Sequence, residues 1–164
     1  MRDVAIAGVG LTPVGEHWDT SLRQLAADAA GRALADAGGA RPDALYVGNA
    51  YGGPISSQTQ LATLVADYAG LAGIEAVGVE AAEASGAAAL RAGYLAVASG
   101  AVESVMVLGV EKASDTVGTD HTLARNVSLD ADYEAIHGAT LPALAALLMR
   151  RYMHEYGVEL AAFE

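Results

Sequence analysis

The sequence contains no cysteine. A thiolate nucleophile, a thiolate metal site and a disulfide framework are therefore excluded for this chain acting by itself. Basic residues are also scarce, because nine Lys and Arg, among them the single lysine Lys112, stand against twenty Asp and Glu and give a net charge of −11. Nucleic acids and anionic membranes are bound through clusters of positive charge, so neither is expected as a partner.

Long apolar runs are missing as well, although 53% of the residues are hydrophobic. No apolar stretch approaches the roughly 20 residues that a membrane-spanning helix needs. The opening residues, MRDVAIAGVGL, place an arginine and an aspartate before a short apolar run that contains glycines, which is not the pattern of a secretory signal. The sequence predicts a cytoplasmic protein of one domain, since 164 residues suffice for one substantial core.

Metal and cofactor motifs are absent from the pattern of polar residues. His154 in MHEYG lacks the second histidine of a helical zinc motif, and the aspartates of residues 115–132 lack the glycine and terminal glutamate of a calcium loop. Gly8 and Gly10 begin like a dinucleotide-binding fingerprint, but its third glycine would fall on Pro13, which favours a simple turn. We therefore expect no metal and no cofactor.

The sequence does contain a regular alternation of short apolar runs and helical segments. Strands are expected at residues 4–9, 44–48, 76–80 and 104–110. Helices are expected at residues 21–37, 58–69, 85–99 and 141–156, with Ser21 and Ser57 as N-caps of the first two. Such alternation is typical of an α/β fold, a mostly parallel sheet covered by helices. Residues 111–138 show no sustained period, and an irregular stretch of that length predicts a functional insertion.

The segment VEAAEASGAAALRAGY, residues 79–94, joins the third strand to the next helix through small residues. It places Glu83 at the bend, with Ala84, Ser85 and Gly86 opening the helix. Backbone amides and the positive end of the helix dipole favour an anion there, lower the pKa of a thiol nucleophile, or stabilise an oxyanion. From these residues alone, Glu83 either stabilises the helix by about 0.3–1 kcal/mol or marks a reactive site.

This segment, continued as VEAAEASGAAALRAGYLAVASG, resembles the nucleophile segment of the thiolases, whose pattern reads E-A-A-C-A-S-G-G-A-A-L, and especially that of the archaeal-type and sterol-carrier-type members. VAIAGVGLTPVG, VMVLGVEKASDT and GATLPALAALLMRRYMHEYGV agree with the family in the same order. The resemblance implies that residues 1–164 are an incomplete N-terminal α/β half of a thiolase, without the C-terminal half. It also implies that the loop at about residues 116–138 lines the acyl-CoA entrance.

The activity implied by the resemblance is acyl transfer between coenzyme A thioesters, by an acetyl-CoA acetyltransferase-like acyl-CoA C-acyltransferase of lipid metabolism. Two departures from the family pattern concern this chemistry. Glu83 stands at the position of the nucleophilic cysteine, and the histidine and second cysteine that the family draws from its C-terminal half are missing. An acyl-enzyme on a carboxylate would be a mixed anhydride, prone to hydrolysis, so we expect this chain by itself to be inactive.

Several roles for the chain remain open. Glu83 could act as a base, since related condensing enzymes with a glutamine at the cysteine position still decarboxylate without condensing. Alternatively, the chain is a non-catalytic scaffold or partner subunit in a homo- or hetero-oligomer with thiolase-type subunits, or it is a truncated or degenerate copy. Acyl-CoA and coenzyme A are the expected substrates of an active assembly.

Overall fold

The computed structural model describes residues 1–163. The chain divides into two compact units, a first unit of Met1–Val117 and a second unit that begins at Gly118. Each unit is considered by itself. None of the described helices is both long and apolar enough to cross a membrane.

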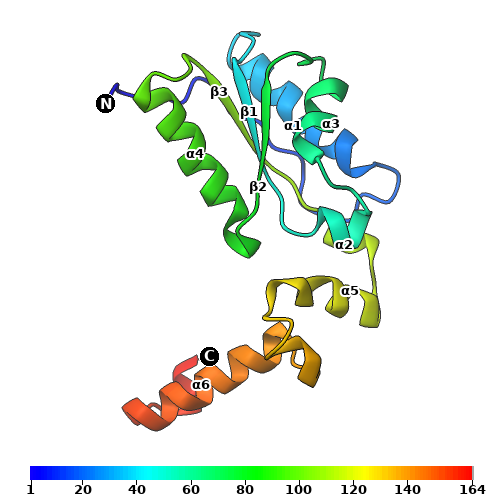
Figure 1. Ribbon diagram of the computed structural model, residues 1–164, viewed down its shortest axis with the longest axis vertical. Coiled ribbons are helices and arrows are strands. Elements are labelled where there is room, and N and C mark those ends of the chain that lie inside the picture. Colours follow the sequence, from blue (N-terminus) through cyan, green and yellow to red (C-terminus); the bar gives the residue numbers. More distant parts are fainter. Residues whose placement is uncertain (164) are drawn as a thin grey trace. The chain divides into compact units, whose positions relative to one another are not determined.

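The sheet of the first unit consists of three parallel strands (Figure 1). β1 (Ala44–Gly48) is central and pairs with β2 (Glu75–Val79) on one side and β3 (Val105–Gly109) on the other. Gly48 is in register with both Val79 and Gly109, so the carboxyl ends of all three strands meet at one edge. Ligand sites of parallel sheets lie at such edges.

Helices cover both faces of this sheet. α1 (Leu22–Asp36) and α3 (Leu61–Tyr68) pack on one face, and α4 (Ser85–Ser99) packs on the other (Figure 1). A short helix, α2 (Gly52–Ser56), follows β1. The parallel sheet between two helical layers confirms the predicted α/β fold class.

The apolar core lies between the sheet and the layer formed by α1 and α3. Leu45 and Val47 of β1 point into it and are almost completely buried, as is Val65 of α3. Small residues of α1, Ala26 and Ala30, allow that helix to lie close to the sheet. β1 is therefore the most buried strand, and the packing around it holds its carboxyl end in place.

The predicted strand at residues 4–9 is wrong, because this segment forms no strand. A strand requires a neighbouring strand, whereas this segment runs along α1: Cβ atoms at Gly8 and Gly10 would lie 2.5 Å from the Ala37 nitrogen and 2.3 Å from the Ala29 carbonyl oxygen. The side chains of residues 4, 6 and 9 are exposed accordingly.

The helix predicted at residues 58–69 begins later, at Leu61, and Ser57 is not its N-cap. Ser57 and Gln60 both have left-handed backbones, with φ of 51° and 53°, which end α2 and delay α3. Left-handed conformations at residues other than glycine have no strong sequence signature, so the pattern of apolar residues alone placed the start three residues too early.

The segment predicted to be irregular contains helical turns. α5 (Gly118–Arg125) lies in it, with shorter 3₁₀ turns at 113–115, 126–128 and 135–137. α6 (Leu141–Tyr156) follows with the predicted bounds, and the hydroxyl of Thr140 caps it by accepting from the Ala143 amide at 3.3 Å. No residue of α6 is buried within the described part of the chain.

Candidate functional site

The candidate site is the elbow between β2 and α4, defined here as residues 80–86. After β2 the chain makes a 3₁₀ turn, Ala82–Ala84, and α4 then begins at Ser85. Ala82 has a φ of 48°, a left-handed conformation that is costly for a residue with a Cβ atom. Such strained positions cluster at active sites and ligand clamps, which makes the elbow a functional-site candidate on its geometry.

The side chain of Ser85 stabilises the turn through two hydrogen bonds. Its hydroxyl accepts a hydrogen bond from the Ala81 amide at 2.9 Å and donates one to the Ala82 carbonyl at 2.6 Å. The side chain of Glu80 accepts from the Ala82 amide at 2.5 Å. Ser85 is only 4% exposed. These bonds fix the backbone on both sides of Ala82 and so oppose its strain.

Gly48 lets the start of α4 approach the sheet closely. A Cβ atom at Gly48 would lie 2.6 Å from the Ser85 carbonyl oxygen and 2.9 Å from the Gly86 Cα. The first turn of α4 therefore sits directly on the carboxyl end of β1, and this contact sets the position of the elbow above the sheet edge.

The carboxylate of Glu83 is bound to the side chain of Tyr51. The Tyr51 hydroxyl donates to Glu83 Oε1 at 2.6 Å. Tyr51 is 6% exposed, whereas Glu83 is an exposed residue. The sequence predicted Glu83 beside the amides that open the helix; the structure places a phenol next to it, from the segment that follows β1.

Glu111, just beyond β3, organises the segment that carries Tyr51. Its carboxylate accepts from the backbone amides of Ala50 and Tyr51, both at 3.0 Å, and from the Asn49 side-chain amide at 3.1 Å. Asn49 also donates to the Val110 carbonyl at 2.8 Å. Hydrogen bonds thus connect the ends of β3 and β1 and, through Tyr51, reach the elbow after β2.

The sequence analysis identified the elbow residues Glu83, Ala84, Ser85 and Gly86 and missed its partners Tyr51 and Glu111. Glu83 stands on the 3₁₀ turn, Ala84 closes it, and Ser85 and Gly86 begin α4. A signal for the missed residues was present, since polar residues directly follow the predicted strands at 44–48 and 104–110. The carboxyl ends of parallel strands share an edge, so these residues had to lie near each other.

Displaced pKa values occur at Asp43 and Tyr46, outside the elbow. Hydrogen bonds from the backbone and hydroxyl of Ser104 lower the pKa of Asp43. Burial, followed by the hydrogen bond to Glu75, raises the pKa of Tyr46. Asp43 directly precedes β1, and Tyr46, in the middle of β1, donates its hydroxyl to Glu75 at the start of β2. Neither residue contacts the elbow through these bonds, so the shifts concern stability and not the candidate site.

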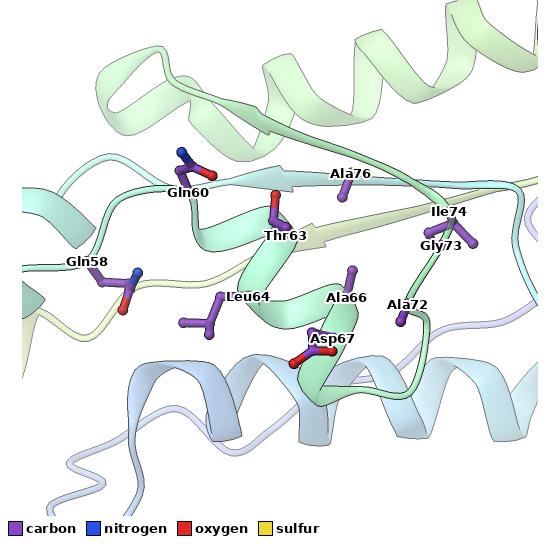
Figure 2. Close-up of a pocket in the computed structure, with 10 residues that line it drawn as sticks. All are labelled: Gln58, Gln60, Thr63, Leu64, Ala66, Asp67, Ala72, Gly73, Ile74 and Ala76. Atoms are coloured by element: carbon purple, nitrogen blue, oxygen red, sulfur yellow. The ribbon is translucent and has the colours of Figure 1, made fainter.

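Two surface cavities lie away from the elbow. The one shown in Figure 2, about 480 Å³, is lined by α3 and by the segment leading into β2, including Gln58, Gln60 and Asp67. It offers no cationic side chain for a phosphate-bearing ligand. A second cavity of about 320 Å³ lies between α1 and Ser56. In the described part of the chain, no three His, Asp or Glu side chains are grouped to hold a metal ion.

Comparison with known proteins gives a family match and similar relatives that include two archaeal proteins. The family described as "Thiolase, N-terminal domain" matches residues 4–162. The acetyl-CoA acetyltransferase of Methanothermobacter thermautotrophicus is 48% identical over 159 residues, covering 96% of this chain and 41% of the relative. The acetyl-CoA acetyltransferase of Methanocaldococcus jannaschii is 48% identical over 162 residues, covering 98% of this chain and 41% of the relative.

Among solved structures, the 3-oxoacyl-[acyl-carrier-protein] synthase III of Aquifex aeolicus is similar to this chain. The TM-score is 0.56 at 26% identity, covering 63% of this chain and 33% of the synthase. The chain thus spans less than half the length of each of these three proteins.

Proposed function

Since the chain belongs to the thiolase family, we propose that it is part of an acyl-CoA C-acyltransferase of the acetyl-CoA acetyltransferase type. The substrates of this assembly would be acyl-CoA and coenzyme A, with no resident cofactor, in a cytoplasmic pathway of lipid metabolism. The observation that carries the proposal is the 48% identity to two archaeal acetyl-CoA acetyltransferases over almost the whole chain.

We further propose that this chain does not itself perform the covalent step. Glu83 occupies the position that the resemblance assigns to the nucleophilic cysteine, and the chain has no cysteine elsewhere. Acyl transfer to Glu83 would exchange a thioester for a mixed anhydride. The hydrogen bond from Tyr51 further lowers the electron density available on Glu83 Oε1. Both effects oppose nucleophilic attack, so the chemistry would need residues from another polypeptide segment.

An alternative is a non-catalytic scaffold or partner subunit in a homo- or hetero-oligomer. Its support is an apolar surface on α4, where Leu90 is 58% exposed and Tyr94 is 46% exposed. Contiguous exposed apolar patches mark interfaces, and these two side chains lie one helical turn apart on α4. A thiolase-type subunit with its own nucleophile is the partner we propose for this surface.

The test is thiolysis of acetoacetyl-CoA by coenzyme A. The wild-type chain and the variants Glu83→Ala and Glu83→Cys are assayed alone and mixed with the protein encoded next to it. We expect no turnover from the wild-type chain alone. Activity of the mixture that appears only with Glu83→Cys supports a retained site whose nucleophile has been lost. Wild-type turnover that disappears with Glu83→Ala would overturn the proposal and make Glu83 catalytic.

The scaffold alternative predicts a different result in the same assay. A mixture whose thiolysis activity survives Glu83→Ala, and in which the chain copurifies with the active subunit, supports it. Leu90→Lys on α4 should then weaken copurification. The matched control is Leu123→Lys, because Leu123 is 60% exposed but belongs to α5 of the second unit.

A further inference from the structure

We propose that Tyr51 is a positioning residue of the elbow: its buried hydroxyl fixes the side chain at position 83, and Glu111 in turn fixes Tyr51. This inference deepens the proposed function, because it names what orients the side chain at the vacated nucleophile position. It rests on contacts within the first unit.

The contact between Tyr51 and Glu83 is short and asymmetric. The hydroxyl oxygen lies 2.6 Å from Glu83 Oε1, within the range of hydrogen bonds to an ionised acceptor. The ring of Tyr51 is buried and therefore has little freedom, whereas Glu83 is exposed and has three rotatable side-chain bonds. The rigid partner determines the geometry, so Tyr51 places the carboxylate and not the reverse.

Tyr51 itself is held from its backbone side. Glu111 accepts from the Tyr51 amide and from the preceding Ala50 amide, both at 3.0 Å. A carboxylate that accepts from two consecutive amides and from the Asn49 side chain fixes the path of this segment. Tyr51 is thus bound at its amide by a residue after β3 and at its hydroxyl by a residue after β2.

This arrangement spans the three strand ends that form the edge of the sheet. The order of contacts is Glu111, Tyr51 and Glu83, each from the segment that follows a different strand. A change at Glu111 should therefore reach Glu83 although no hydrogen bond between these two carboxylates is involved. A merely local capping role for Glu83 predicts no such coupling.

The experiment follows the titration of the Glu83 carboxyl by NMR in the full chain with ¹³C-labelled glutamate. The Glu83 resonance is assigned with Glu83→Gln. Tyr51→Phe removes the donor to the ionised carboxylate, so the titration midpoint of Glu83 should move to higher pH. Glu111→Gln should move it in the same direction by a smaller amount. The matched control is Tyr46→Phe, which removes a different tyrosine–glutamate hydrogen bond, to Glu75, and should leave Glu83 unchanged.

A reciprocal measurement covers the case in which Tyr51→Phe fails to fold. With ¹³C-labelled tyrosine, Glu83→Gln should move the titration midpoint of Tyr51 to lower pH, since a neutral amide no longer disfavours the phenolate. Glu83 is exposed, so this variant leaves the core intact. The proposal is overturned if Tyr51 does not respond to Glu83→Gln, or if folded Tyr51→Phe leaves Glu83 unchanged. Neither measurement uses a thioester, so a failure of the thiolysis proposal would not affect them.

Discussion

The substitution Gly48→Ala tests whether the elbow is positioned by close contact between β1 and α4. The added methyl carbon would lie 2.6 Å from the Ser85 carbonyl oxygen, 2.8 Å from its carbonyl carbon and 2.9 Å from the Gly86 Cα. All three are backbone atoms, so no side-chain rotation can relieve the overlap. The backbone φ of Gly48 is not in the left-handed region, and the effect is therefore one of space.

The expected cost is that of overpacking a well-packed contact, about 1–3 kcal/mol of unfolding free energy. For a chain of this size, that corresponds to a decrease of about 2–12 °C in Tm. Urea unfolding followed by circular dichroism and a thermal scan measure both quantities. The position of the elbow should change as well, visible as amide chemical-shift differences at Ser85 and Gly86.

The matched control is Gly31→Ala, in the middle of α1. Apart from its chain neighbours and the backbone of its own helix, no atom lies within 4 Å of a Cβ at Gly31, and the residue is exposed. Alanine is the better helix former by about 0.5–1 kcal/mol, so this substitution should stabilise the protein. Opposite signs for the two glycines are the expected result. If Gly48→Ala is as stable as the wild type, α4 does not approach β1 as closely as described.

Three further predictions concern stability and are checked by urea unfolding. Hydrogen bonds from Ser104 lower the pKa of Asp43 below its ordinary value of 3.8. This carboxylate therefore stabilises the fold above that pH, and its contribution is lost as pH falls through the folded-state pKa. The variant Asp43→Asn should be less stable than the wild type at neutral pH, and the two unfolding free energies should become equal in acid. Asp115→Ala removes the carboxylate 2.6 Å from the buried ammonium of Lys112 and should cost about 3–5 kcal/mol, whereas Lys112→Met, which removes the buried charge, should cost less. Ser21→Ala removes the N-cap of α1 and should cost about 1 kcal/mol.

Elements whose signals are local were predicted with correct bounds. β1 (Ala44–Gly48), α4 (Ser85–Ser99) and α6 (Leu141–Tyr156) have the predicted limits, because each combines a clear apolar period with a glycine at or just beyond its end. The resemblance to the thiolases, stated from four segments, is confirmed by the family match over residues 4–162. The extent of the domain and the entrance role of residues 116–138 stay predictions.

Elements that depend on distant partners were not predictable from the sequence alone. Residues 4–9 have the composition of a buried strand, but pairing is a non-local property, and here the segment lies along α1. The same limit applies to the site. Glu83 was found because its turn is local, whereas Tyr51 lies 32 residues away in the sequence and Glu111 reaches Tyr51 across 60 residues.

The contacts that shape the elbow do not involve the side chain at its bend, Glu83. Ser85 ties the backbone at residues 81 and 82, and Gly48 admits the first turn of α4; neither contact involves the side chain of Glu83. A substitution at position 83 therefore changes the chemistry offered at the sheet edge without removing what shapes the turn. This separation explains how the elbow can carry a carboxylate and keep its fold. It also makes Glu83→Cys a fair test of the site. If this variant has no thiolysis activity, the cause is not a distorted elbow, because the contacts of Ser85 and Gly48 remain.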